Sequence, residues 1–272
     1  MTLRLGIVGG GGWMGQAIAR AVLDARLVDP RALTLSWRSR APEGFPDEVE
    51  LTRDNAELCA CSDVVVLSVR PGDWAGLALP APGRLVISVM AGVALAALAE
   101  RHETHRVIRT LPNAAAEVGA SYTPIVAAPA VNAADRATAR AIFACCGPID
   151  ELAREDHLDY FSGLTGTGPA YPALMAAAMV ADATARGIPR DLARRAVSTL
   201  FIGAGRLLER SAEDPDDTVA TFLDYRGVTA AGLAAMRDAG FDAAIRTGLA
   251  EAFTCAVALA ALTEPPNRNA GA

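Results

Sequence analysis

The sequence contains no lysine, because all 25 of its Lys and Arg residues are arginine. This absence excludes mechanisms that need a lysine Schiff base or a lysine general acid or base. The basic residues are outnumbered by 31 acidic ones, which gives a formal net charge of −6. A protein that binds nucleic acid would present a basic face. No nucleic-acid partner is therefore predicted.

Long apolar runs and paired cysteines are also missing. No uninterrupted apolar stretch approaches the roughly 18 residues of a membrane span, and the residues 1–8 lack the layout of a signal peptide. We therefore expect a cytoplasmic protein with no membrane partner. None of the five cysteines forms a Cys-x-x-Cys pair or has a histidine at ligand spacing. No metal site is predicted.

The first half of the chain alternates short apolar runs with helical patterns. The runs are β-branched and nearly continuous, which is typical of strands covered by helices on both faces. This alternation predicts an α/β fold class with an N-terminal doubly wound, Rossmann-type sheet. The predicted strands cover 3–8, 33–37, 64–69, 85–89, 106–109 and 122–127, and the predicted helices cover 15–27, 94–101 and 133–145.

The second half has a different character. From about Asp156 onward no strand pattern remains, and Ala- and Leu-rich segments with helical spacing follow one another. Residues 170–185 carry almost no charge, and a helix that is apolar all round needs burial on all sides. We expect a first domain at 1–158 and an all-helical domain at 159–272, whose helices form a homodimer or a higher homo-oligomer. The tail from Glu264 is predicted to be disordered.

A glycine-rich turn follows the first predicted strand. Gly10, Gly12 and Gly15 fit the spacing Gly-x-Gly-x-x-Gly, and Trp13 and Met14 lie within it. Glycine permits the tight turn, the close approach of a pyrophosphate and helix–strand packing, and the next helix start faces the phosphates. The strand before this turn and the helix after it favour a dinucleotide-binding domain over a glycine-rich turn without a ligand.

The end of the second predicted strand indicates which dinucleotide is bound. An NAD enzyme places a carboxylate there, whereas an NADP enzyme often uses arginine for the 2′-phosphate. Here Ser36 is followed by Arg38 and Arg40, with no carboxylate between them. These residues predict NADPH as the cofactor, with NADH as the alternative. The other interpretation of the two arginines is that they are merely solvated loop residues.

Further cofactor contacts are expected at the carboxyl ends of other strands, where ligands of such sheets bind. Asn113 follows the fifth predicted strand and could bond the carboxamide or ribose of the cofactor. It could equally be an ordinary helix N-cap. The other expected contacts in these loops are Val69, Arg70, Pro71, Ala91 and Gly92.

Where the two halves of the chain meet, small hydroxyl residues alternate with glycines. Thr165 and Thr167 belong to the segment 163–171, in which Pro169 falls at a first helical position. We expect exposed backbone N–H groups and short hydroxyls at this helix start. Thr165 is a candidate for substrate binding and Thr167 for catalysis.

With these motifs in place, the chain resembles the pyrroline-5-carboxylate reductase family. That family has a glycine-rich turn followed by Asn-Met, a Ser-x-x-Ala-Gly-Val strand end, a Met-Pro-Asn turn, a Ser-Gly-Ser-Gly-Pro-Ala-Tyr junction and a late Ser-Pro-Gly-Gly-Thr-Thr loop. The corresponding segments here are 10–14, 88–93, 111–113, 165–171 and 224–229, and Glu155 and Asp159 match an acidic pair ahead of the junction. The motifs occur in the family's order over essentially the whole chain.

The resemblance implies a reaction and a substrate site. The reaction would be NADPH-dependent hydride transfer to the C=N bond of a cyclic imino acid, converting 1-pyrroline-5-carboxylate to proline. The N–H groups of Gly227, Val228 and Thr229 would hold the substrate carboxylate at a helix start. The Thr229 hydroxyl would lie near the ring nitrogen and act in catalysis.

The chain also departs from the family pattern. Trp13 replaces Asn, Ala114 replaces Thr, and the segment 224–226 replaces Ser-Pro-Gly. Arg226 could bind a carboxylate through a charge-assisted contact, whereas Asp224 would repel one. Two alternatives therefore stay open: reduction of a different cyclic imine, and a catalytically idle NADP-binding regulatory protein. A hydroxy-acid dehydrogenase is disfavoured because the chain has no lysine to protonate an alkoxide.

Overall fold

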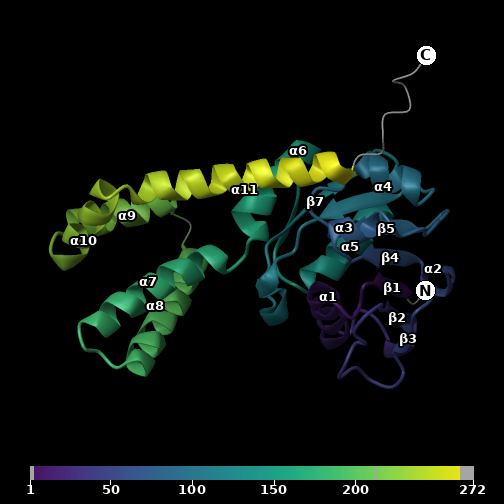
Figure 1. The fold of residues 1–272 in the computed structure, drawn as a ribbon, viewed down its shortest axis with the longest axis horizontal. Coiled ribbons are helices and arrows are strands. Elements are labelled where there is room, and N and C mark those ends of the chain that lie inside the picture. The colour runs from purple at the N-terminus through teal and green to yellow at the C-terminus, as the bar shows by residue number, and fades with distance from the viewer. Residues whose placement is uncertain (1–2, 212, 264–272) are drawn as a thin grey trace, which may run out of the picture. The chain divides into compact units, whose positions relative to one another are not determined.

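The computed structural model describes residues 3–211 and 213–263, and the tail predicted to be disordered lies outside them. The chain forms two compact units (Figure 1). The first combines the residues up to Gly168 with those from Ala250 on, and the second covers Pro169–Leu249. The boundary expected between residues 158 and 159 stays a prediction.

The first unit is built on one sheet with the strand order β3-β2-β1-β4-β5-β6-β7-β8. All neighbouring strands pair in parallel except β6 and β7, which are antiparallel. The direction of winding reverses between β1 and β4, and such a switch point is where doubly wound sheets bind ligands. The strands are β1 (Leu5–Val8), β2 (Leu33–Ser36), β3 (Glu50–Thr52), β4 (Val64–Leu67), β5 (Leu85–Ser88), β6 (Val107–Thr110), β7 (Thr123–Ala127) and β8 (Ile149–Glu151).

Helices cover this sheet. Every residue of β1, β4, β5 and β6 is buried, as expected for a sheet with both faces covered. The doubly wound domain predicted from the alternating pattern is therefore confirmed. Its helices are α1 (Trp13–Asp24), α2 (Asn55–Cys61), α3 (Pro71–Trp74), α4 (Leu95–Arg101), α5 (Ala133–Ala144) and α6 (Glu155–Phe161), with short turns η1 (Pro30–Ala32), η2 (Ala114–Val118) and η3 (Ser162–Gly166).

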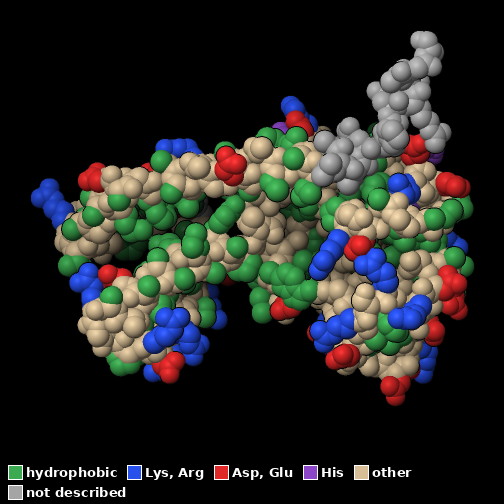
Figure 2. All heavy atoms as spheres, in the orientation of Figure 1, with side chains coloured by type: hydrophobic (Ala, Val, Ile, Leu, Met, Phe, Trp, Pro, Cys, Tyr) green, Lys and Arg blue, Asp and Glu red, His purple; other side chains and the backbone are tan. Residues whose placement is uncertain are grey.

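The second unit is helical, as predicted. It contains α7 (Ala170–Ala185), α8 (Arg190–Arg210), α9 (Pro215–Asp224), α10 (Val228–Asp238) and the beginning of α11 (Phe241–Thr263). Its buried apolar residues are few, and Val180, Ala193 and Val197 form one small cluster between α7 and α8. Large apolar side chains remain exposed along these helices (Figure 2), among them Leu174, Leu200, Ile202, Leu207 and Leu208. A single copy of this unit does not bury its own apolar surface.

Helix α11 has a further property that a search for uninterrupted apolar runs misses. Its segment Phe241–Ala260 is long and apolar enough to cross a membrane, judged by length and composition alone, and 6% of the qualifying window is buried. Isolated charged residues such as Arg246 and Glu251 interrupt the segment. This length, composition and exposure would suit a helix covered by another protein chain, and they would equally suit a helix covered by lipid.

A buried histidine makes the stability of the first unit depend on pH. The His102 side chain is fully buried, its Nε2 accepts a hydrogen bond from Trp74 Nε1 at 3.0 Å, and its Nδ1 lies 2.8 Å from the carbonyl oxygen of Leu79. Nδ1 therefore carries the proton of a neutral ring. Burial lowers the pKa of His102 from its ordinary value of 6.5.

Because this folded-state pKa lies below the unfolded one, the unfolded chain binds the extra proton first as the pH falls. We expect the free energy of unfolding to be unaffected by His102 above pH 6.5 and to decrease below it. Urea unfolding between about pH 5 and 8 measures this slope. His102→Gln should be less stable throughout and should show a flatter slope, and an unchanged slope in that variant would rule out His102 as its source.

Candidate active site

The glycine turn between β1 and α1 is shaped by close backbone contacts. Gly9 has φ +83°, a conformation that side chains rarely adopt, and a Cβ there would lie 2.3 Å from the Ser68 carbonyl oxygen. A Cβ on Gly15 would lie 2.5 Å from the Gly9 carbonyl oxygen. The turn is anchored to β2 because the Gly10 N–H donates to Ser36 O at 2.7 Å. The strand, turn and helix expected of a dinucleotide site are thus present.

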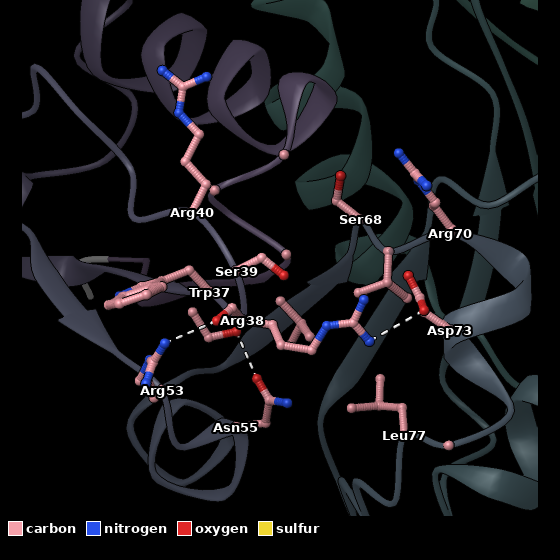
Figure 3. A pocket seen from close by; sticks show the side chains of 17 residues that line it. Trp37, Arg38, Ser39, Arg40, Arg53, Asn55, Ser68, Arg70, Asp73 and Leu77 are labelled. Carbon is pink, nitrogen blue, oxygen red and sulfur yellow. Dashed lines mark hydrogen bonds and ion pairs between the residues drawn. The ribbon is translucent and has the colours of Figure 1, made fainter.

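A cavity of about 820 Å³ opens beside this turn, at the carboxyl ends of β1, β2 and β4 (Figure 3). Five of the predicted cofactor residues line it, namely Gly12, Ser36, Arg38, Val69 and Arg70. The predicted Gly10, Trp13, Met14, Gly15, Pro71, Ala91, Gly92 and Asn113 are not among its lining residues. The cavity is within the first unit and lies at the switch point of the sheet.

The cavity is strongly basic. Arg38, Arg40, Arg53 and Arg70 line it, against Asp73 as the one acidic residue in the described lining. At the helix start beside it, the first N–H groups of α1 have no intrahelical partner and carry partial positive charge. This combination suits a ligand with several phosphate groups.

Two of the predicted arginine positions are already paired. Arg38 Nη1 lies 3.1 Å from Asp73 Oδ1, and Arg40 Nη2 lies 3.7 Å from Glu43 Oε1. Both arginine side chains are more than two-thirds exposed, at 77% and 73%, so these pairs are weak and a phosphate could replace the carboxylates. Sequence reasoning did not find Arg53 or Asn55, because they reach the cavity from the loop after β3 and from the start of α2.

The predicted residues outside the cavity lining have identifiable positions. Trp13 begins α1, is 55% exposed, and its indole N–H donates to Glu117. Gly92 has φ +73°, and a Cβ on it would lie 2.9 Å from the backbone nitrogen of Ala260 in α11. The structure thus places Gly92 against a helix. The remaining members of this set are Gly10, Met14 and Gly15 in the turn and first helical turn, Pro71 at the start of α3, and Ala91 in the loop after β5.

Asn113 is a helix cap. It precedes η2, and its Oδ1 accepts the Ala115 N–H at 2.9 Å. Its own N–H donates to Ser121 Oγ at 2.9 Å, and the residue is 7% exposed. Capping was one of the two interpretations left open by the sequence, and the structure shows it. Contact with a cofactor through the side-chain NH₂ group stays a prediction.

The junction differs in detail from the expected helix start. Residues Ser162–Gly166 form a π-helical turn, and α7 begins one residue after Pro169, which caps it. The Thr167 hydroxyl donates back to the Gly163 carbonyl oxygen at 3.1 Å, and that of Thr165 is 3.5 Å from the Phe161 carbonyl oxygen. Both hydroxyls therefore donate to the carbonyl group four residues earlier instead of lying free at a helix start. The donated bond uses the hydroxyl proton and leaves the acceptor lone pairs of each oxygen for a ligand. π-helical turns are frequent at functional sites.

An ion cluster built on the buried Arg109 side chain connects β6 with α6. Arg109 near the end of β6 is 2% exposed and bonds Glu155 at 2.7 Å and Asp159 at 2.8 Å, both on α6. Glu155 Oε1 also accepts the N–H of Leu95, the first residue of α4, at 2.7 Å. The cluster therefore ties together the end of β6, the start of α4 and the helix that leads into the junction.

The late loop lies in the second unit and ends in a helix start. Arg226 and Gly227 have positive φ values of +59° and +98°. Gly227 is the N-cap of α10, and Val228 and Thr229 are its first two residues. Val228 is 92% exposed, and Thr229 is also exposed. Because the cap residue is a glycine and makes no side-chain cap bond, Thr229 does not cap its own helix.

Two family models match the chain. Residues 155–259 match pyrroline-5-carboxylate reductase dimerisation, and residues 4–92 match NADP oxidoreductase coenzyme F420-dependent. The chain is 32% identical over 252 residues to a pyrroline-5-carboxylate reductase of Synechocystis, covering 90% of this chain and 94% of that protein. It is 34% identical over 230 residues to that of Thermus thermophilus, covering 80% and 85%.

Solved structures share the fold. The Plasmodium falciparum pyrroline carboxylate reductase with NADP bound has a TM-score of 0.83 at 22% identity, covering 95% of this chain and 98% of that one. The pyrroline-5-carboxylate reductase of Coxiella burnetii gives a TM-score of 0.83 at 23% identity, covering 95% and 99%. The identity and coverage of the sequence relatives, together with this shared fold, show that the chain belongs to the pyrroline-5-carboxylate reductase family.

Proposed function

We propose that the protein reduces 1-pyrroline-5-carboxylate to proline with NADPH, by hydride transfer to the C=N bond. The basic cavity beside the glycine turn is the observation that carries the cofactor part of this proposal. Its residues fit a phosphorylated dinucleotide in charge and position. NADH is the alternative cofactor. The absence of lysine from the chain supports an imine over a ketone substrate, since a cyclic iminium needs no side chain to protonate an alkoxide.

The residues of the chain would bind and orient the reactants. The cofactor, when bound, supplies the hydride. Gly12, Ser36 and Arg38 would hold its adenosine and phosphate portion, and the loops joined by the Arg109 cluster would support its nicotinamide end. Rate enhancement then comes from alignment of the two reactants.

The substrate side of the proposal rests on the junction and the late loop. The N–H groups of Gly227, Val228 and Thr229 would bind the carboxylate, with a charge-assisted contact from Arg226. Thr165 would also bind the substrate. Thr229 and Thr167 would assist catalysis, with the Thr229 hydroxyl bonding the ring nitrogen as it becomes an amine.

Oxidation of NADPH, followed at 340 nm with cyclic imino acids of five- and six-membered rings, tests the function. Turnover that is fastest with 1-pyrroline-5-carboxylate is expected. Faster turnover of another ring would instead support a different cyclic imine, which the altered segment 224–226 motivates. Tight NADPH binding with no turnover of any imine would support the regulatory protein.

Thr229 offers a test of the catalytic assignment. Thr229→Val keeps the shape of the side chain and removes its hydroxyl, and we expect kcat to fall about 10- to 100-fold, the worth of one charge-assisted hydrogen bond. Thr229→Ser restores the hydroxyl and should recover most of the rate. Thermal melting should be the same for all three proteins, because Thr229 does not cap α10. A loss of about 1 kcal/mol of stability with normal turnover would assign the hydroxyl to the helix instead.

We also propose that residues 159–272 act as the substrate and dimerisation domain and assemble a homo-oligomer through the C-terminal helices. The dimerisation match over 155–259 and the exposed apolar side chains of α7 and α8 support this. Light scattering of the purified protein should give at least a dimer at micromolar concentration. Cell fractionation should place it in the cytoplasm. A monomer would contradict the proposed homo-oligomer. Recovery with membranes would contradict the cytoplasmic location and favour a lipid-covered α11.

A further inference from the structure

The four arginines of the basic cavity differ in what neutralises them. Arg38 is paired with Asp73 and Arg40 with Glu43. Arg53 and Arg70 have no carboxylate partner among the described residues. Arg70 follows β4 at the switch point, whereas Arg53 follows β3, next to the end of β2. The end of β2 is where the adenosine ribose is recognised in this fold.

The Arg53 side chain is held in place from two directions. Its Cζ lies 4.2 Å from the centroid of the Trp37 ring, a distance typical of a cation–π contact. Its Nη2 donates to the Arg38 carbonyl oxygen at 3.0 Å. Figure 3 shows Arg53 against the Trp37 ring, whereas Arg40 points away from both. A guanidinium already held over an aromatic ring loses less freedom when it binds an anion.

We infer that Arg53, ordered by Trp37, is the principal determinant of specificity for the 2′-phosphate of NADPH. This inference rests on the proposed NADPH-binding function. A phosphate that binds Arg38 must first displace Asp73, which lies 3.1 Å away, whereas Arg53 has no carboxylate partner among the described residues to displace. Arg53 contributes an undivided charge at an orientation that is set before the cofactor binds.

The positive charge of Arg53 also favours a phosphate over a ribose hydroxyl. An arginine presents only donors, which suit a phosphate with several acceptor oxygens. Ser36 Oγ donates to Asn55 Oδ1 at 2.6 Å, so a hydrogen-bonded polar pair lines the same cavity. This pair offers a neutral contact for a ribose whether or not the 2′-phosphate is present.

Binding of two cofactor fragments separates recognition from turnover. Adenosine 2′,5′-bisphosphate carries the 2′-phosphate, and adenosine 5′-monophosphate lacks it. Isothermal titration calorimetry should show that the full chain prefers the bisphosphate. Arg53→Met should weaken the bisphosphate by about 10- to 100-fold, as expected for the loss of a charge-assisted contact, and change the monophosphate less than about twofold.

Arg101 provides the matched control. Its Cζ lies 4.4 Å from the Trp74 ring and its Nη1 donates to the Ala75 carbonyl oxygen at 2.8 Å, so it repeats the Arg53 arrangement without lining the cavity. Arg101→Met should leave the affinities for both fragments unchanged. Arg38→Met should reduce the preference for the bisphosphate by less than Arg53→Met does.

Three outcomes would overturn the inference. These are equal weakening of both fragments by Arg53→Met, a larger loss of preference in Arg38→Met, and no preference for the bisphosphate in the unmodified protein. Turnover of imines is not needed for any of these measurements. A protein that binds the fragments as expected but reduces no imine would therefore disprove the proposed reaction and leave the role of Arg53 intact.

Discussion

Arg109→Met should lower the free energy of unfolding of the protein by about 2–3 kcal/mol, less than the roughly 3–5 kcal/mol found for fully buried ion pairs, because its carboxylate partners are partly exposed. Arg109 is 2% exposed, and its guanidinium is the only described partner on β6 for Glu155 and Asp159. Without it, two neighbouring carboxylates on α6, which are 34% and 17% exposed, face each other with no cation from β6. Methionine fills much of the volume of the arginine side chain, so the loss of stability comes from the missing charge and not from a cavity.

Urea unfolding measures this effect, and Arg4→Met is its control. Arg4 forms a two-pronged ion pair with Asp63 in the same unit, at 2.6 and 3.1 Å, but the pair is about half exposed. Such a pair adds little to stability, so the control should move the urea midpoint only slightly. Similar midpoints for the two variants would show that burial of the Arg109 cluster does not set its contribution.

The cluster should also affect cofactor handling in the protein that remains folded. Glu155 holds the Leu95 N–H at 2.7 Å and thereby the start of α4. Glu155→Gln keeps a hydrogen-bond acceptor there and leaves Arg109 paired with Asp159. We expect this variant to lose less stability than Arg109→Met, while kcat with NADPH falls more than the affinity for NADPH, because the segments that the cluster fixes lie on the proposed nicotinamide side.

The strands that could be predicted from the sequence are those buried on both faces. β1, β4 and β5 consist of buried residues throughout. A strand that is buried on both faces appears in the sequence as a nearly continuous run of apolar residues. β3 and β8 were missed because they are the two outermost strands and three residues long, with mostly exposed or half-buried side chains. An edge strand of this length leaves no periodic pattern.

Helix α2 was missed although its sequence carries a signal. Asp54 caps it by accepting the N–H groups of Ala56 and Glu57, and Glu57 stands three residues after the cap. This is the spacing of a capping box. The helix has seven residues, so its hydrophobic periodicity is too short to detect, and only the cap could have revealed it.

The site divides along the same lines. The glycine turn and Arg38 are local in sequence and could be predicted. Arg53 reaches the cavity from another element, and Arg109 meets its partners 46 and 50 residues away. Neither position is specified by a motif, because each depends on which strands become neighbours. A buried arginine in a strand is nevertheless a usable signal, since such a charge requires a carboxylate partner.

Gly15→Ala is expected to disrupt the dinucleotide site by changing the backbone of the turn. The added Cβ would lie 2.5 Å from the Gly9 carbonyl oxygen and 3.0 Å from the Gly10 Cα. Both are backbone atoms and cannot move like the end of a flexible side chain. The position of Gly9 is also constrained, because its φ is +83° and its Cα lies close against the Ser68 carbonyl oxygen. The turn must therefore open, at a cost of about 1–3 kcal/mol or more, as for other overpacked sites.

Gly72→Ala is the matched change, because Gly72 lies in the short helix α3 and a Cβ there meets nothing within 4 Å. This substitution should leave the free energy of unfolding unchanged or raise it by up to about 1 kcal/mol, because alanine lowers the conformational entropy of the unfolded chain. Thermal melting with and without NADPH distinguishes the two effects of Gly15→Ala. We expect a lower melting temperature without cofactor and little further rise on adding NADPH, since the displaced backbone no longer presents the start of α1 to the pyrophosphate. A normal NADPH-induced rise in Gly15→Ala would show that the pyrophosphate binds elsewhere, whatever happens to the melting temperature of the free protein.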